Sequence, residues 1–242
     1  MGAVEIICMA NSRKLDGRCI AGLKTDGGGW VRPVSADQGG ALPPYQCRVD
    51  DGTEVRTLDV IRLDLSIPLP QSYQPENWLV RNTMPWRLIS RPAPESLIQI
   101  MRSNLVSGPC LLGNTNDRVP AASFSGTSAP SSLALVIPRN PYLRVTKDVN
   151  NRKQLRAIFE ISRTYYDLVV TDPVWERKLR NHPEGDYPLT AAGLKPDDMV
   201  LLTVSLGEPF NGYCYKLVAA IIVLPESWRD FFEPRRLGVA TK

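Results

Sequence analysis

Apolar and polar residues alternate over several short stretches of this sequence, and a period of two is typical of β-strands that are buried on one face. The clearest stretch runs from 55 to 67, where Ile61 and Leu63 fall on one face and Arg62 and Asp64 on the other. Long apolar, β-branched runs near the C-terminal end predict strands as well. The predicted strands are 5–9, 18–23, 30–35, 55–67, 86–90, 133–137, 142–147, 154–162, 166–170, 199–206 and 213–224.

Few stretches have the spacing of a helix. Residues 95–102 predict one. A second helix is predicted after Thr171-Asp172-Pro173, because Thr171 or Asp172 suits the cap of a helix and Pro173 suits its first turn. A short helix is predicted at 228–232.

Residues 103–132 divide the chain. They are rich in Ser, Gly and Pro and lack periodicity, so we predict a long connection there. Several strands, turn signals and one helix lie on each side, which fits a five-stranded Greek-key barrel in each half. The sequence therefore predicts a mostly β fold of two small OB-like barrels packed together, each with about one helix, with domains at 1–102 and 133–242.

Composition is that of an ordinary folded protein. The chain has 242 residues, with 29 Lys and Arg against 25 Asp and Glu, which gives a formal net charge of +4. This mild charge permits a polyanionic partner without requiring one. No run approaches the roughly 20 apolar residues that span a bilayer, and no cationic segment typical of a secretory signal opens the chain. We therefore expect a cytoplasmic protein without membrane contact.

Cysteine and histidine limit the chemistry. The five cysteines are scattered without a C-x-x-C pair, so we expect buried or half-buried thiols instead of a disulfide framework or a zinc site. The single histidine, His182, lies in a polar, turn-rich stretch with no nucleophile motif nearby. Walker loops, dinucleotide fingerprints and the H-E-x-x-H and G-x-S-x-G motifs are missing from the sequence. We expect no catalytic residue set, no metal and no cofactor.

Polar and basic residues gather early in the chain. Asn11, Ser12, Arg13 and Lys14 form a polar stretch between two predicted strands, and Arg18 follows it. We interpret the stretch as a loop able to hold a phosphate, because Arg offers a planar fork and Lys a point charge. A solvated hairpin without a ligand explains the same pattern.

Trp30 and Arg32 lie on one face of a predicted strand, since they are two residues apart. Trp30 could stack on a base while Arg32 neutralises a phosphate, as OB barrels do with single strands. The alternative is a core tryptophan beside an arginine that pairs with a neighbouring acid.

The second half repeats this combination of charge and aromatic rings. Arg144 and Lys147 belong to a basic hairpin, which indicates either polyanion binding or a solvated ribbon. Tyr213 and Tyr215 share a strand face beside a Gly-rich turn and could stack on a ligand, and Lys216 lies opposite them. The predicted nucleic-acid- or anion-binding residues are Asn11, Ser12, Arg13, Lys14, Arg18, Trp30, Arg32, Arg144, Lys147, Tyr213, Tyr215 and Lys216.

Four segments, in order over nearly the whole chain, resemble the dual OB-containing domain family of bacteria. The first is 11–22, which begins with Asn-Ser-Arg-Lys, and the second is 29–35, with the sequence Gly-Trp-Val-Arg-Pro-Val-Ser. The third is 166–173, which contains Tyr-Asp-Leu and Thr-Asp-Pro, and the fourth is 205–218, which begins with Ser-Leu-Gly. The resemblance implies two OB-type barrels, binding of nucleic acid or nucleotides, and a place in bacterial conflict or antiviral systems. It implies no catalytic residues.

We therefore expect a non-enzymatic module that binds nucleic acid, with single-stranded or modified nucleic acid favoured, and other proteins of a defence system as further partners. One alternative is a sensor that holds a small nucleotide-like ligand between the barrels, and another is a protein-interaction subunit of a defence complex. A third is a metal-dependent phosphodiesterase that uses Asp16, Asp172 and Glu208, provided that these acids converge.

Overall fold

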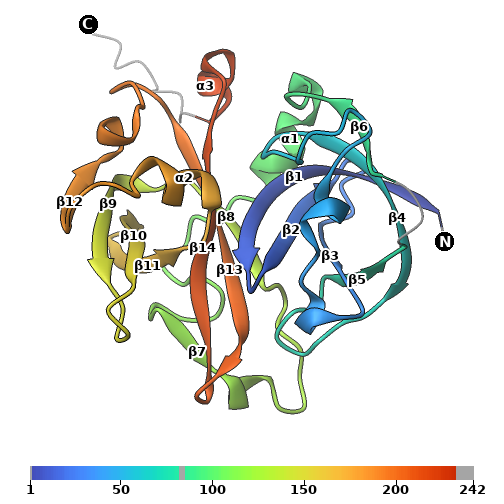
Figure 1. Ribbon diagram of the computed structural model, residues 1–242, viewed down its shortest axis with the longest axis horizontal. Coiled ribbons are helices and arrows are strands. Elements are labelled where there is room, and N and C mark those ends of the chain that lie inside the picture. The colour runs from blue at the N-terminus through green and yellow to red at the C-terminus, as the bar shows by residue number, and fades with distance from the viewer. Residues whose placement is uncertain (1, 82–84, 233–242) are drawn as a thin grey trace, which may run out of the picture.

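The computed structural model describes residues 2–81 and 85–232, so residues 233–242 of the predicted second domain lie outside it. The protein is mostly β: of the described residues, 48% lie in strands, isolated bridges included, and 16% in helices, 3-10 turns included. One sheet is built from the first half of the chain and lies beside a second sheet built from the second half (Figure 1). The predicted fold class, two OB-like barrels with few helices, is confirmed.

The first sheet contains a closed barrel. Its strands follow the order β1-β2-β3-β5-β4, and pairing of β1 with β4 closes the circle. Strands β3 and β5 are parallel and the other pairs are antiparallel, as a five-stranded Greek-key barrel requires. Strand β6 adds to the outside of β4. The bounds are β1 (Ala3–Lys14), β2 (Gly17–Lys24), β3 (Trp30–Val34), β4 (Val60–Pro68), β5 (Asn77–Val80) and β6 (Arg87–Ser90).

The second sheet repeats this plan with one interruption. Strand β8 pairs with β13 and β9 pairs with β10, so β8 and β9 together take the place that β1 has in the first barrel. The break falls at 137–138, where Pro138 has no N–H to give to a ladder. Strands β11 and β14 are parallel, like β3 and β5. The bounds are β7 (Arg118–Pro120), β8 (Leu133–Val136), β9 (Arg139–Lys147), β10 (Lys153–Ile161), β11 (Thr164–Val170), β12 (Gly185–Pro188), β13 (Val200–Phe210) and β14 (Tyr213–Val223).

The helices are short and lie where the sequence predicts them. They are α1 (Ile98–Ser103), α2 (Pro173–Lys178) and α3 (Arg229–Phe232), with 3-10 turns at Gln38–Gly40, Pro44–Cys47, Glu95–Leu97, Ala121–Phe124, Leu189–Ala192 and Glu226–Trp228. Asp172 caps α2 by accepting a hydrogen bond from the Val174 N–H. Within the described ranges no helix has the length and apolar character needed to cross a membrane.

Two sequence-based expectations need correction. The polar stretch 11–14 is not a loop, because β1 continues through Lys14 and pairs with β2 as far as Lys14 opposite Gly17. The polar side chains of this stretch form hydrogen bonds with neighbouring elements. The β1–β2 pairing can therefore continue beyond the last apolar residue of β1. The cysteines are also not all covered, since Cys110 is exposed. The sequence pattern does not predict strands β5, β7 and β12, because strands of three or four residues are too short to show a period of two.

Strand β1 is apolar on both faces because it borders two cores. Ile6 and Cys8 point into the first barrel, whereas Ile7 and Met9 point out of it toward the second barrel. The outer faces of β8, β13 and β14 meet this side with Leu135, Leu201 and Ile222. The inter-barrel core, defined as this shared apolar cluster, therefore covers the outer side of β1, β2 and β3. In Figure 1 the β13–β14 hairpin lies directly beside β1.

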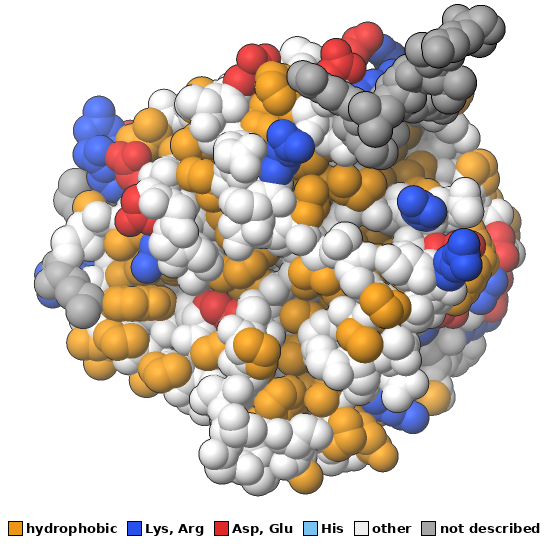
Figure 2. Space-filling model, turned by 180° about the vertical axis from the view of Figure 1, so that it is seen from behind, with side chains coloured by type: hydrophobic (Ala, Val, Ile, Leu, Met, Phe, Trp, Pro, Cys, Tyr) orange, Lys and Arg blue, Asp and Glu red, His pale blue; other side chains and the backbone are white. Residues whose placement is uncertain are grey.

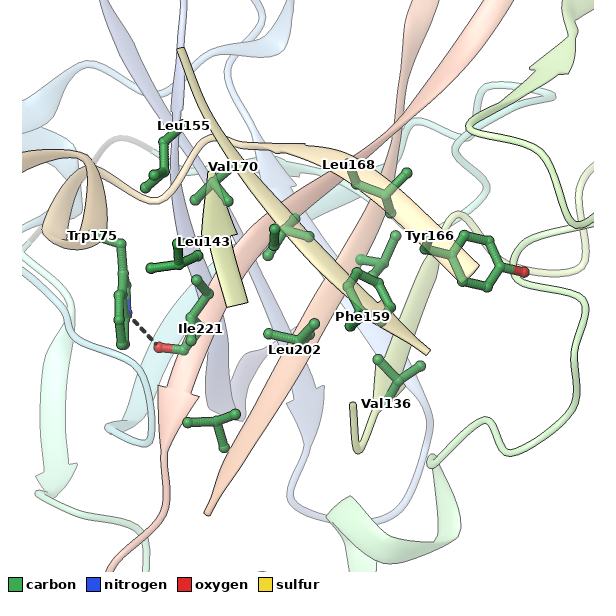
Figure 3. Packing of buried hydrophobic residues seen from close by; sticks show 14 of the residues in the cluster. Val136, Leu143, Leu155, Phe159, Tyr166, Leu168, Val170, Trp175, Leu202 and Ile221 are labelled. Carbon is green, nitrogen blue, oxygen red and sulfur yellow. Dashed lines mark hydrogen bonds between the residues drawn. The ribbon is translucent and has the colours of Figure 1, made fainter. Parts of the chain in front are cut away.

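The interior of the second barrel is filled by large side chains. Phe159 is fully buried and stacks on Tyr166, with ring centroids 5.6 Å apart. Trp175 extends from α2 into the same core and donates its indole N–H to the Ile221 carbonyl at 2.8 Å (Figure 3). The helix between β11 and β13 is thus anchored on the barrel by one aromatic residue.

Candidate functional site

The tip of the first hairpin is tied to the second barrel by ion pairs. Arg13 forms a two-pronged pair with Glu176 of α2, at 2.8 and 3.2 Å, and this hydrogen bonding raises the pKa of the guanidinium. Lys14 donates to Glu208 at 2.8 Å and to the Gly39 carbonyl at 2.5 Å. These two predicted cations are therefore neutralised by carboxylates of the other barrel.

Arg18 and Asn11 share a carboxylate nearby. Arg18 lies 2.6 Å from Glu54, and the Asn11 amide donates to Glu54 and to the Val55 carbonyl, both at 2.9 Å. Burial acts to raise the pKa of Glu54, but the hydrogen bonds from Arg18 and Asn11 outweigh it and hold that pKa below its ordinary value. Ser12 is buried and donates to the Cys19 carbonyl at 3.3 Å.

Trp30 and Arg32 lie inside the molecule. Trp30 is half-buried against the inter-barrel core, and Arg32 is only 3% exposed. Arg32 donates to the hydroxyls of Ser132 and Ser205, at 2.8 and 3.1 Å, and to Cys19 Sγ at 3.2 Å, and no carboxylate of the described residues pairs with it. Neither side chain is placed to meet a ligand from solvent.

Lys216 is buried as well. Its ammonium group donates to Asn114 Oδ1 at 2.7 Å, to the Asn114 carbonyl at 2.8 Å and to the Asn116 carbonyl at 2.6 Å. Burial lowers the pKa of Lys216 to about 8. This lysine holds the 114–116 segment against β14.

Arg144 and Lys147 lie on the outer face of the second barrel, each with an acid. Arg144 forms a two-pronged pair with Asp186, at 2.6 and 3.0 Å, and lies 3.5 Å from Asp167. The bond from Arg144 holds the pKa of Asp186 below its ordinary value. Lys147 lies 2.9 Å from Glu184. The face is polar, but its charges are largely balanced.

A cluster of three aromatic rings, two exposed and one half-buried, surrounds the β13–β14 turn. Phe210 and Tyr213 are 65% and 38% exposed. The Tyr215 ring centroid lies 6.5 Å from the ring centroids of both. The Arg118 guanidinium covers Tyr213 and Tyr215, at 4.8 and 5.6 Å from the two ring centroids. The structure thus brings two of the predicted tyrosines together with an arginine from β7.

A hollow of about 600 Å³ adjoins this cluster. Its walls come from the 115–120 segment and from strands β10, β11 and β14. Tyr165 of β11, which is 59% exposed, lines it together with Tyr213, Arg118 and Arg156. Strands β10 and β11 are the second and third strands of this barrel, and the corresponding face of OB barrels holds oligonucleotides and oligosaccharides. We call these rings and Arg118 the aromatic platform, made of Phe210, Tyr213, Tyr215, Tyr165 and Arg118.

On the first barrel the corresponding face is covered by the second barrel. Its second and third strands turn Ala21, Leu23 and Trp30 outward, and all three pack in the inter-barrel core. The second barrel packs through β8, β13 and β14, so its β10–β11 side stays open. The way the barrels are joined leaves one OB face available.

The three candidate carboxylates do not assemble a metal site. Glu208 is paired with Lys14, and Asp172 is buried with both oxygens occupied, one by Val174 N–H at 2.9 Å and the other by Ile221 N–H at 3.1 Å. No group of three or more His, Cys, Asp or Glu in residues 2–81 and 85–232 is arranged to hold a metal ion. The cap interpretation of Asp172 is confirmed.

Comparison with known proteins identifies the family. The family model described as the dual OB-containing domain matches residues 4–221, which is most of the chain. The chain belongs to the dual OB-containing domain family. No curated protein matches it.

Solved structures resemble this dual OB-containing domain only distantly. The tetrameric p202 HIN2 is 7% identical with a TM-score of 0.30, over 93% of this chain and 94% of that chain. The Ifi202 HINa domain in complex with 20-bp dsDNA is 9% identical with a TM-score of 0.31, over 92% of this chain and 94% of that chain. Scores this low carry no assignment of binding.

The sequence pattern could have identified some residues of the platform. Along β11 the odd residues Tyr165 and Asp167 face out while Tyr166 and Leu168 are buried, so the alternation could have identified Tyr165. No alternation of apolar and polar residues identifies Arg118 as part of the platform. Arg118 lies on a three-residue strand that reaches β14 from almost a hundred positions away in the chain.

The buried Asp172 predicts a pH effect on stability. Burial raises its pKa from 3.8 to about 6, against hydrogen bonds that lower it. The folded state therefore binds this proton more tightly than the unfolded chain, so the contribution is largest below about pH 4 and is lost as pH rises through about 6. We expect the free energy of unfolding of the wild type, relative to Asp172→Asn, to fall by up to about 3 kcal/mol between these limits. Urea unfolding at several pH values measures it, and parallel curves would contradict it.

Proposed function

We propose that this dual OB-containing domain binds single-stranded nucleic acid on the β10–β11 face of its second barrel. The observation that carries the proposal is the aromatic platform beside the hollow of about 600 Å³. Exposed rings on an OB face are suited to stack on bases, and such stacking tolerates any sequence because every base has a π-face. A single strand is favoured because the bases of a duplex are already stacked on one another.

Arg118 has two uses in this proposal. Its guanidinium already covers the rings of Tyr213 and Tyr215, and it is 46% exposed, so one side remains free for a phosphate. Asp117 is its one carboxylate partner among the described residues, at 3.7 Å. An arginine held over aromatic rings can contact the backbone while the neighbouring rings take the bases.

The proposal does not depend on the cations of the first hairpin. Arg13, Lys14 and Arg18 are engaged by carboxylates, and each would have to give up an ion pair to bind a phosphate. The surface seen from behind carries Lys and Arg mainly toward its edges, with a largely uncharged centre (Figure 2). On this face the arrangement favours local stacking over a broad basic field. A role in a bacterial conflict or antiviral system is part of the proposal and rests on the family resemblance.

Salt dependence tests the electrostatic part. With one phosphate neutralised by Arg118, a plot of log affinity against log salt is expected to have a slope of about −0.7 for a single strand. Fluorescence anisotropy with labelled single-stranded DNA, single-stranded RNA and duplex, between about 50 and 200 mM salt, measures it. Weaker binding of the duplex is expected. Absence of binding to all three would overturn the proposal.

A further inference from the structure

A second cavity lies between α2 and the first barrel, near the opposite end of β14 from the platform. Its volume is about 490 Å³, within the range of small-molecule sites. Both barrels contribute to it: β1, β2 and the 54–57 segment on one side, α2 and β14 on the other. The polar and charged side chains of its lining include Asn11, Arg18, Glu54, Arg56, Asp172 and Arg177.

The charges around this cavity favour an anion. Arg56 and Arg177 are both exposed, and neither has a carboxylate of the described residues within ion-pair distance. Arg18 adds a third guanidinium, with Glu54 as its partner. The Asp172 carboxylate is turned to two backbone N–H groups instead of to the arginines. Two guanidinium groups are thus available to a ligand, and such forks match phosphate oxygens.

A buried hydrogen-bond acceptor on Asn11 indicates what the part of the ligand beyond its phosphate would carry. The Asn11 amide nitrogen donates to two acceptors, the Glu54 carboxylate and the Val55 carbonyl, which fixes the orientation of the group. Its carbonyl oxygen Oδ1 is shielded from solvent and has no hydrogen-bond partner. Buried acceptors are almost always paired, so a hydroxyl or amino group of a ligand would complete this one.

We propose that the cavity binds a small phosphate ester with free hydroxyl groups, such as a nucleotide or a sugar phosphate. Arg56 and Arg177 hold the phosphate, and Asn11 Oδ1 accepts from a hydroxyl. Because the walls come from both barrels, an occupant bridges them and stabilises the pair against unfolding. This inference is independent of the proposed function, since the cavity shares no lining residue with the platform hollow.

Isothermal titration calorimetry of the full chain tests the proposal with four probes: adenosine 5′-monophosphate, ribose 5-phosphate, inorganic phosphate and adenosine. We expect saturable binding of the two esters at one site, at least tenfold weaker binding of inorganic phosphate, and none of adenosine. Arg56→Gln and Arg177→Gln are each expected to weaken binding of the esters at least tenfold. Arg102→Gln removes an exposed arginine of α1 away from the cavity and should leave it unchanged.

A further variant shows whether the esters bind in the cavity or at the platform. The Tyr165→Ala/Tyr213→Ala variant, which alters only the platform, should bind the esters as the wild type does. If it loses them, the esters bind at the platform as fragments of nucleic acid, and the cavity is not their site. Binding of adenosine equal to that of its monophosphate, no binding of any probe, or equal loss with Arg102→Gln would also overturn the proposal.

Discussion

Phe159→Ala is expected to lower the free energy of unfolding by about 3–5 kcal/mol, among the largest effects that one substitution can have in this chain. Phe159 is fully buried at the centre of the second barrel, where it stacks on Tyr166 (Figure 3). Alanine removes the ring and leaves a cavity between strands that cannot collapse, because β10 is paired on both sides.

Phe210→Ala supplies a matched control for this prediction. The substitution is chemically the same, but Phe210 is 65% exposed at the end of β13, so its stability change should stay within about 0.5 kcal/mol. Urea unfolding followed by circular dichroism gives both values. Equal losses for the two variants would mean that the barrel interior is not packed as described. Phe210→Ala should instead weaken oligonucleotide binding, because it removes a ring of the platform.

The fold could be predicted because its signals are local. Alternation located the strand at 55–67, and the structure has β4 (Val60–Pro68) there with Ile61 and Leu63 buried and Arg62 exposed. The continuous apolar character of β1 was harder to interpret. It arises because Ile6 and Ile7 face different cores, and the second core exists only once the barrels have packed together.

The site could be predicted only in part, because ion pairing is not local. Arg13 and Lys14 indicate an anion site in the sequence, but their carboxylates lie 163 and 194 positions away. Arg32 looks like a surface cation on an alternating strand, yet its hydroxyl partners come from 100 and 173 positions away. Tyr213 stays exposed and Tyr215 half-buried because the β13–β14 turn extends past the inter-barrel core. Which polar residues remain free is decided by the docking of the barrels, and no pattern along one strand contains that information.

The same docking explains why two similar barrels would divide their roles. The outward side chains of β2 are Ala21 and Leu23, which suit a protein core. The outward side chains of β11 include Tyr165 and Asp167, which suit a polar or aromatic ligand. The first barrel therefore uses its second and third strands to pack against its neighbour, whereas the equivalent strands of the second barrel stay open for the binding that we propose.

Tyr165→Ala/Tyr213→Ala should abolish most of the oligonucleotide affinity. Base stacking on an aromatic ring contributes about 1–3 kcal/mol per base, so the loss of two rings is expected to raise Kd at least about thirtyfold. Both side chains line the hollow and are 59% and 38% exposed, so the variant should fold with nearly unchanged stability. Anisotropy titration of labelled single-stranded DNA measures the change.

Two control variants separate stacking from other causes. Tyr165→Phe/Tyr213→Phe keeps both rings and should stay within about threefold of the wild-type Kd, since stacking needs the ring and not the hydroxyl. Tyr45→Ala removes a ring that is 65% exposed on the first barrel and should have no effect on Kd. If the double alanine variant binds like the wild type, the platform is not the site. If the phenylalanine variant loses as much as the alanine variant, the hydroxyls bind the strand and stacking does not, because only the hydroxyls distinguish it from the wild type.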